Sequence, residues 1–410
     1  MKSILRLSLL LSLALFGLCA EIAAQGNMHV VSGVVRDANT GRKLSQASIT
    51  TIGGHEATVT NVDGRFTLKT VEKPHFIVVS CLGYNAIRLS LDGQKVTDLK
   101  VKLTPGTITL EELIVTSMDP KEIVLAAMAK VPDNYSRNNE LMRCFYRETT
   151  QKGRRYIDVA EAVTLLYKSG YNKKIPLDRV AIEKGRQLIS ERAADTLGAK
   201  MRGGPALAVH LDLVKFPDLL LSNEELDFYK LQMEIPVTID GRPQMVISFA
   251  PAYITDHVLY YGKIYIDRQT LTFTRIEMSF DMRDELRATA CMLLHKPAGV
   301  RFKPREMKTT VAYRMVDGVS RMHYMHSDVR FYCEWKKKLF ASPYHVEAEM
   351  VVTDLVSEDA KPIPAREAFS SHDAYYDKAK AFSDPNFWED YNIIEPSESL
   401  EHAVHKLKKK

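Results

Sequence analysis

Apolar residues recur at every second position along much of this chain, and this alternation most constrains its fold. In residues 230–239 the apolar side chains occupy the odd positions, and the even positions are mostly polar. Successive side chains of a β-strand point to opposite faces, so a period of two indicates strands with one covered face. The same alternation appears in residues 157–167, 245–249, 262–267, 276–280, 307–315 and 344–352. The sequence therefore predicts a mainly β fold with an antiparallel sheet.

The first hundred residues contain shorter strand-like runs at closer spacing. Turn signals separate these runs at residues 37–41 and at the pairs Gly53-Gly54, Asp63-Gly64 and Asp92-Gly93. An Asp-Gly pair between alternating runs is a strong hairpin signal, because glycine accepts a positive φ without steric cost. Several short strands with close turns predict an immunoglobulin-like or transthyretin-like β-sandwich at residues 25–117.

A set of motifs within this sandwich occurs in a recognisable order. The motifs are Gly33-Val34-Val35-Arg36-Asp37, Thr40-Gly41, Leu44-Ser45-Gln46-Ala47, Thr60-Asn61-Val62-Asp63-Gly64-Arg65-Phe66, Leu82-Gly83-Tyr84 and Leu110-Glu111-Glu112-Leu113-Ile114-Val115. Over residues 30–115 the chain resembles the carboxypeptidase regulatory-like domain, which is typical of surface and outer-membrane proteins of Bacteroidetes-type bacteria. The resemblance implies an accessory sandwich that carries no zinc ligand and no catalytic residue.

The remaining residues, 118–410, are expected to form a second domain with helices at both ends. Asp119 is a good N-cap and Pro120 suits a first turn, so a helix should begin there and end by Pro132. A short helix is expected at residues 372–381. Ser397 can cap a last helix with one apolar stripe that packs on the sheet. The residues of this stripe are Leu400, Ala403, Val404 and Leu407.

Two further resemblances concern this second domain. Residues 262–267 and Ile276-Glu277 are similar to a segment of lipoprotein-carrier-like half-barrels, and the likeness extends over residues 157–355. It implies a curved antiparallel sheet that wraps a helix and leaves an apolar cleft. Asn134-Tyr135 and residues 145–148 and 387–394 resemble uncharacterised envelope proteins that carry the same N-terminal domain, which implies no known activity.

The N-terminus has the pattern of a secretory signal. Lys2 and Arg6 precede an apolar stretch at residues 7–18, and Ile22-Ala23-Ala24 forms a small-residue cleavage site. We expect residues 1–24 to be removed and the mature chain to begin at Gln25. Cys19 leaves lipidation as an alternative, although Leu18 is not the small residue that lipoprotein signals prefer. The protein is then exported to the periplasm or is associated with the outer membrane.

Charge and cysteine content limit the partners. The formal net charge of +5 over 410 residues does not indicate nucleic acid binding. The Lys-rich end, residues 406–410, suits either a solvated tail or peripheral contact with acidic lipid headgroups. The cysteines of the mature chain are far apart, and their spacing assigns no disulfide. They are Cys81, expected to be a buried free thiol, and Cys144, Cys291 and Cys333.

Candidate chemical groups are scattered along the sequence. His323 and His326 should point to opposite faces of a strand, and His402 and His405 share a helix face without an acidic third ligand. No G-x-S-x-G elbow occurs, and Gly203-Gly204-Pro205 lacks the Lys-Ser/Thr of a phosphate loop. The sequence therefore predicts no catalytic residue, no cofactor and no metal ligand. The residues weighed for glycan chemistry are Glu111, Glu112, Glu224, Glu225, Asp281, Asp284, Glu285, Trp335 and Trp388.

Taken together, these features favour a non-enzymatic envelope protein for binding or assembly, with an apolar ligand or a partner protein. The alternative is an envelope hydrolase that acts on glycan or peptide through an unrecognised site. Methionines recur in or beside the apolar sets of the second domain, and they suit either a core or an adaptable apolar cleft. They are Met233, Met245, Met278, Met307, Met315 and Met350.

Overall fold

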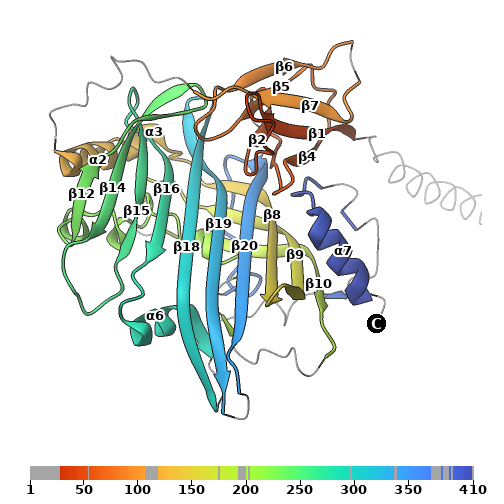
Figure 1. Ribbon diagram of the computed structural model, residues 1–410. Helices are drawn as coiled ribbons and strands as arrows, with labels where there is room; N and C mark the ends of the chain where they lie inside the picture. Colours follow the sequence, from red (N-terminus) through yellow and green to blue (C-terminus); the bar gives the residue numbers. More distant parts are fainter. Residues whose placement is uncertain are drawn as a thin grey trace, which may run out of the picture.

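Figure 1 shows a small sandwich of short strands packed on a sheet of much longer strands. Strands account for 50% of the chain and helices for 13%, which confirms the predicted mainly β class. The computed structural model describes residues 28–53, 55–93, 95–106, 119–173, 176–192, 200–201, 204–295, 298–336, 339–370, 380–381, 387–388 and 391–408.

The N-terminal part is a β-sandwich of two layers with its own core; one layer is antiparallel, and the other is mixed because β1 pairs parallel with β7. A layer of three strands, in the order β4–β1–β7, faces a layer of four, in the order β3–β2–β5–β6. Ile49, Phe66 and Ile77 are buried between them. Gly64 adopts the positive φ expected of its turn, at +70°. The strands are β1 (His29–Asp37), β2 (Ser48–Thr51), β3 (Ala57–Val59), β4 (Arg65–Thr70), β5 (Phe76–Ser80), β6 (Ile87–Ser90) and β7 (Leu99–Leu103).

The second part is built on one sheet of twelve strands. Neighbours pair antiparallel from β12 to β10, and the sheet is curved and open, as predicted. The last described strand, β21, pairs parallel with β10, and β13 pairs with β14. In spatial order the strands are β12 (Tyr229–Met233), β14 (Arg242–Pro251), β15 (Tyr260–Asp267), β16 (Phe273–Phe280), β18 (Val300–Val316), β19 (Val319–Trp335), β20 (Ser342–Ser357), β8 (Glu140–Lys152), β9 (Arg155–Lys168), β10 (Arg179–Ile189) and β21 (Lys380–Ala381), with β13 (Val237–Ile239) beside β14.

The alternating run at residues 231–239 forms two short strands, although a single strand was expected. β12 ends at Met233, β13 begins at Val237, and both pair with β14. Pro236 lies between them, and proline has no backbone N–H to donate to a ladder.

The two predicted terminal helices are confirmed at their N-caps. The Asp119 carboxylate accepts from the Lys121 N–H at 2.8 Å, and the Ser397 hydroxyl accepts from the Leu400 N–H at 3.2 Å. The first of these helices ends at Ala129, before Pro132, which lies in a separate short helix. The helices are α2 (Pro120–Ala129), α3 (Val131–Asn134), α4 (Leu207–His210), the 3-10 helix η2 (Pro217–Leu219), α5 (Asn223–Leu226), α6 (Glu285–Met292) and α7 (Glu398–Lys408).

The short helix expected at residues 372–381 is not confirmed. Residues 371–379 lie outside the described residues, and Lys380–Ala381 form strand β21. A separate two-stranded ladder joins β11 (Lys200–Met201) to β17 (Leu293–His295). Within the described part of the chain, no helix is long and apolar enough to cross a membrane.

Both faces of the central strands are covered. We call the face that packs against α2 and the crossing segment (residues 204–226) the inner face; Tyr146 and Met350 are buried there. The opposite, outer face buries Phe145 and Val351 together with Val59 of the sandwich. Because neighbours in sequence point to opposite faces, the sequence of a strand that is covered on both sides is a continuous run of apolar residues.

The sandwich contacts the outer face through side chains and through the C-terminal segment (residues 391–397). The Ser48 hydroxyl lies 3.0 Å from His323 Nε2 of β19. Thr58 donates to the Ile393 carbonyl at 3.0 Å, and the Asn392 amide exchanges two hydrogen bonds with the Lys69 backbone. The C-terminal segment thus lies between the first domain and the sheet.

Candidate functional site

Three rows of directly paired residues cross the inner face of β18, β19, β20, β8 and β9. Each row takes one residue from every strand, and consecutive rows lie two residues apart. We number the rows in the direction of β19, from Met325 to Val329. The first row is Val311, Met325, Met350, Tyr146 and Ala162. The middle row is Thr309, Ser327, Ala348, Glu148 and Ala160, and the third row is Met307, Val329, Val346, Thr150 and Asp158.

A cavity of about 320 Å³ lies over the middle and third rows. Its walls come from the sheet on one side and from α4 and α6 on the other, and they are mainly apolar. The volume is at the lower end of the range for small-molecule sites in proteins. We call this cavity the inner pocket; it is lined by Glu148, Ala206, Leu207, His210, Leu211, Phe280, Cys291, Met292, Met307, Ser327, Val329, Val346 and Ala348.

Glu148 is the carboxylic acid in the wall of the inner pocket. Its position among apolar side chains raises its pKa, because burial penalises the charged form. The Tyr146 hydroxyl donates to Glu148 Oε2 at 2.6 Å, and a backbone bond from Gly204 acts with it against the shift. The carboxyl group is therefore fixed in orientation and disposed to hold a proton.

Two hydroxyl groups of the middle row are buried without a hydrogen-bond partner in the described structure. They belong to Ser327 and Thr309, each 2% exposed, which pair directly across β19 and β18. Buried polar groups in folded proteins nearly always have a partner, so each exception needs an explanation. Ser327 lines the inner pocket, whereas its neighbours Val329 and Met325 are apolar.

Asp158 lies in the third row, at its β9 end. Burial raises its pKa to about 7, a hydrogen bond from Gln187 opposes this shift, and the nearby Glu148 charge adds to it. Two acidic groups with raised pKa values therefore belong to adjacent rows of one sheet face. Of these two residues, only Glu148 lines the inner pocket.

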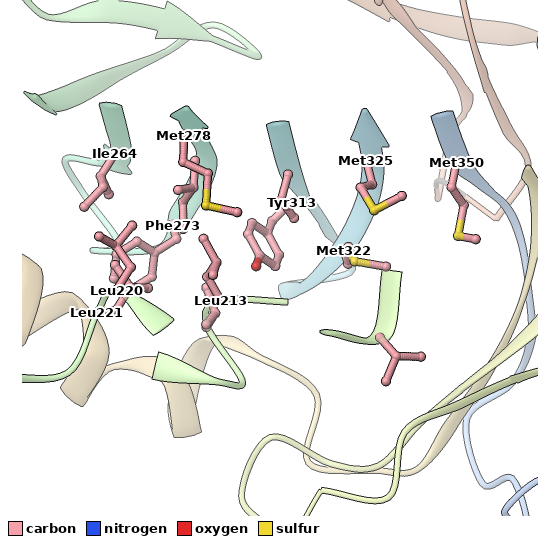
Figure 2. Close-up of a cluster of buried hydrophobic side chains, with 14 of the residues drawn as sticks. Leu213, Leu220, Leu221, Ile264, Phe273, Met278, Tyr313, Met322, Met325 and Met350 are labelled. Carbon is pink, nitrogen blue, oxygen red and sulfur yellow. The ribbon is translucent and has the colours of Figure 1, made fainter. Parts of the chain in front are cut away.

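Most of the recurrent methionines fill the core. Met245, Met278 and Met350 are buried in the main cluster, and Met233 packs against it. Figure 2 shows Met278, Met325 and Met350 extending from three strands of the same sheet toward the side where Leu213 and Leu220 lie. Met307, by contrast, lines the inner pocket, so only that methionine fits the cleft interpretation directly.

A buried ion network holds the crossing segment to the inner face. Lys168 Nζ lies 2.5 Å from Asp212 and 2.9 Å from Asp178, and Lys215 lies 2.8 Å from Asp178. The hydroxyls of Tyr171 and Tyr313 donate to the two oxygens of Asp212, at 2.6 and 2.9 Å. Two lysines balance two aspartates, so this cluster is paired and hydrogen-bonded, as buried charges require.

The histidine pairs weighed from the sequence make separate contacts. A bulge in β19 leaves His323 without a partner in β18, which breaks the alternation assumed for His323 and His326. His323 contacts Ser48, and His326 contacts Glu347 at 2.9 Å. Burial holds the pKa of His323 well below its usual range. The described residues include no group of His, Cys, Asp or Glu side chains placed to hold a metal ion.

The carboxylates weighed for glycan chemistry do not converge on one cavity. Asp284 caps α6, Asp281 bonds Arg283, and Glu224 and Glu225 lie in the first turn of α5. Glu111 and Glu112 lie outside the described residues. Within the described chain the inner pocket therefore receives none of the predicted carboxylate pairs.

The tryptophans and cysteines behave mainly as packing residues. Trp388 lies edge-on to Phe145, with ring centroids 5.6 Å apart, and its Nε1 donates to Glu161 at 3.1 Å. Cys81 is a free thiol, as expected, but it is half-buried and not fully buried. Among the described residues Cys144, Cys291 and Cys333 also form no disulfide.

A second depression, which we call the basic groove, lies between α7 and the strands β9 and β10. It measures about 600 Å³ and collects four cationic side chains against one carboxylate, Glu191. These cations are Arg154, Arg155, Arg192 and Lys406. His402 also lines the groove, so this histidine lies among cations and not among metal ligands.

Comparison with known protein families identifies the first domain. Residues 31–115 match the family described as CarboxypepD_reg-like domain, which confirms the resemblance seen in the motifs. The match covers the sandwich and leaves the sheet domain unassigned. None of the curated proteins compared with the chain matches it.

Three solved structures show remote likenesses to this chain. A DUF1329 family protein from Desulfovibrio piger shares 9% identity over 57% of this chain and 94% of its own, with a TM-score of 0.27. MucB in complex with MucA(peri) shares 14% identity over 59% of this chain and all of its own, with a TM-score of 0.16. A LolA superfamily protein from Nitrosomonas europaea shares 9% identity over 62% and 100%, with a TM-score of 0.20. At such scores these likenesses carry no conclusion about function.

Proposed function

We propose that this protein is an exported envelope protein that binds a small apolar molecule in the inner pocket. The observation that carries the proposal is the pocket itself: about 320 Å³ of space with mainly apolar walls, on a sheet face whose first row is buried in the main core cluster. Apolar surface that lines a cavity gains free energy when a ligand removes it from water. We propose a role in binding or assembly, without catalysis, on this basis.

The arrangement of the walls supports the proposal. The sheet wall is a continuous ladder from β18 to β8, whereas the opposite wall consists of the short helix α4 and the eight-residue helix α6. A rigid sheet with a cover of short elements suits a site that must open to admit a greasy molecule.

The binding test has two steps. Protein purified from its own envelope is extracted with organic solvent, and the extract is examined by mass spectrometry. An apolar fluorescent probe is then titrated into the delipidated protein. We expect saturable binding in the wild type and its loss in Ala348→Phe, which places a ring in the inner pocket. Ala365→Phe, at an exposed loop position, is the matched control and should bind like the wild type. Absence of both bound lipid and saturable binding would reject the proposal.

A hydrolase would require a different arrangement of groups in the same site. Two carboxyl groups would have to face one cavity with room for substrate between them. Glu148 faces the inner pocket, and Asp158 stands in the next row without lining it. The apolar walls favour binding over such chemistry, and turnover of a glycan or peptide by the purified protein would reverse this preference.

A second candidate role is peripheral contact with an anionic lipid surface, and the basic groove favours it. The groove gathers Arg154, Arg192 and Lys406 beside the start of the Lys-rich end. We expect the protein to co-sediment with phosphatidylglycerol vesicles at low ionic strength and not with phosphatidylcholine vesicles. The Arg154→Ala/Arg192→Ala variant should lose this binding, and the matched Lys100→Ala/Lys102→Ala variant, at exposed sandwich positions, should keep it. Equal binding to both lipids would reject the role.

A further inference from the structure

The middle row carries polar groups with which a purely apolar ligand could form no hydrogen bond. The hydroxyls of Ser327 and Thr309 are buried and unpartnered in the described structure. Because these residues pair directly in an antiparallel ladder, their Cβ atoms lie about 5 Å apart on the same face. One of the two, Ser327, also lines the inner pocket. The floor of the pocket therefore carries hydrogen-bonding capacity that the protein does not satisfy itself.

The small side chain between the polar groups leaves room for a ligand atom. Ser327 pairs with Ala348, and Ala348 pairs with Glu148, so the serine and the acid flank the alanine across three strands. Adjacent strands are about 4.8 Å apart, so the two outer backbones are separated by roughly twice that distance. Ala348 does not extend beyond its Cβ. A head group seated over Ala348 would reach Ser327 on one side and Glu148 on the other.

The titratable residues that line the pocket limit the kinds of head group that it can bind. Among its lining residues the titratable side chains are Glu148, His210 and Cys291, and no lysine or arginine is present. Neighbouring protein atoms partly screen the His210 ring from water, which lowers its pKa. A carboxylate or phosphate head group would therefore meet the acid of Glu148 without a compensating cation, with Asp158 one row away. A serine hydroxyl can both donate and accept, and a carboxyl oxygen can accept.

We infer that the ligand of the inner pocket enters head first and carries an uncharged hydroxyl-type head group, which bonds Ser327 and Glu148 at the middle row while its apolar chain lies against the third row. This inference rests on the proposed binding function, and it specifies the class of ligand: a neutral long-chain alcohol or hydroxyl-bearing lipid, not a fatty acid or a phosphate ester.

The test is displacement of an apolar fluorescent probe from the full chain by three ligands with the same ten-carbon tail. These are 1-decanol, decanoate and decylammonium. We expect decanol to displace the probe at about one tenth of the concentration that decanoate requires, which corresponds to one hydrogen bond of ordinary strength. Ser327→Ala should raise the concentration of decanol needed for displacement by up to about tenfold while the probe itself still binds. Equal or better displacement by decanoate or by decylammonium would overturn the inference.

Two controls separate a loss of the head-group contact from a loss of the fold. Thr309→Val and Ser327→Ala each remove a buried hydroxyl that has no partner among the described residues, so neither should lower the melting temperature. Ser320→Ala changes another buried serine of β19, remote from the pocket walls, and should leave the decanol preference unchanged. If the probe binds but the three ligands displace it at the same concentration, the inference fails and the proposed function stands. If no probe binds, both fail.

Discussion

Two buried polar residues at the inner face differ in whether the protein supplies them with hydrogen-bond partners. Asp212 accepts from two tyrosines and lies beside Lys168, so its charge is fully compensated within the protein. Ser327 lies on the sheet face that the crossing segment covers and has no such partner in the described structure. Both side chains are nearly inaccessible, at 0% and 2% exposed. The contrast separates residues that stabilise the fold from residues that are available to a ligand.

The first residue-scale prediction concerns Asp212. Asp212→Ala removes the shared acceptor of Tyr171 and Tyr313 and leaves the buried Lys168 with Asp178 only. Breaking a buried pair by removing one partner typically costs 3–5 kcal/mol, so we expect a loss of about 4 kcal/mol in the free energy of unfolding. Urea denaturation measures this change. Asp218→Ala, an exposed aspartate of the same crossing segment, should change stability by less than about 0.5 kcal/mol. Equal effects would contradict the structural role of the network.

The second residue-scale prediction concerns Asp158, whose pKa rises from 3.8 to about 7 in the folded protein. The folded state then binds a proton that the unfolded state has released between pH 4 and 7, so stability falls as the pH rises through this window. Asp158→Asn cannot titrate but can still accept from Gln187. We expect the variant to match the wild type near pH 4 and to be more stable at pH 8, by about 4 kcal/mol at most. Parallel stability curves from pH 4 to pH 8 would contradict the shift.

At the scale of elements, the alternation located β20, whose residues 344–349 alternate between buried and half-buried, and did not locate β8, most of which is covered on both faces. β20 was expected from the parity of Tyr344, Val346 and Ala348, and these residues do point to the inner face. β8 was not expected, because Phe145 and Tyr146 are both buried, on opposite faces. The outer cover comes from the sandwich and the C-terminal segment, which the local pattern around β8 cannot reveal.

The candidate site could not be predicted from the sequence, for a related reason. Ser327, Ala348 and Glu148 are neighbours only because β19, β20 and β8 are adjacent, and β8 and β20 are separated by about two hundred residues of chain. The crossing segment that covers this face has helices of three or four residues, too short for a periodic signal. The N-cap residues Asp119 and Ser397 were predictable because capping depends on local sequence alone.

The prediction at this scale is that the sandwich folds without the sheet. A fragment of residues 25–117 should melt cooperatively, because Ile49, Phe66 and Ile77 form a core that draws only on its own strands. Circular dichroism during heating measures this. Ile49→Ala removes a fully buried side chain and should lower the melting temperature of the fragment, at a cost of about 2–5 kcal/mol. A fragment without structure would show that the first domain depends on the outer face of the sheet.

At the scale of the whole molecule, the sandwich and the inner pocket occupy opposite faces of one sheet. Val59 packs with Phe145 and Val351 on the outer face, while Ala348 and Glu148 face the pocket. A partner held by the sandwich would therefore not block the pocket. This separation suits an envelope protein that is anchored or recognised through one domain and binds its ligand through the other.

The export prediction belongs to this scale. We expect protein purified from its native envelope to begin at Gln25, because Ile22-Ala23-Ala24 provides the cleavage site. Intact mass spectrometry measures the start of the mature chain. A chain that begins with an acylated Cys19 would show that the protein is a lipoprotein, and an uncleaved chain would contradict export by this signal.

The position of the C-terminal segment between the sandwich and the sheet has a consequence for the speed of folding. The hydrogen bonds of Thr58 and Asn61 to this segment each join residues 335 positions apart. Contacts between such distant residues close long loops, which makes them slow to form relative to hairpins. Refolding should therefore show a fast phase in which the local strand pairs form and a late, concentration-independent phase in which the two domains dock.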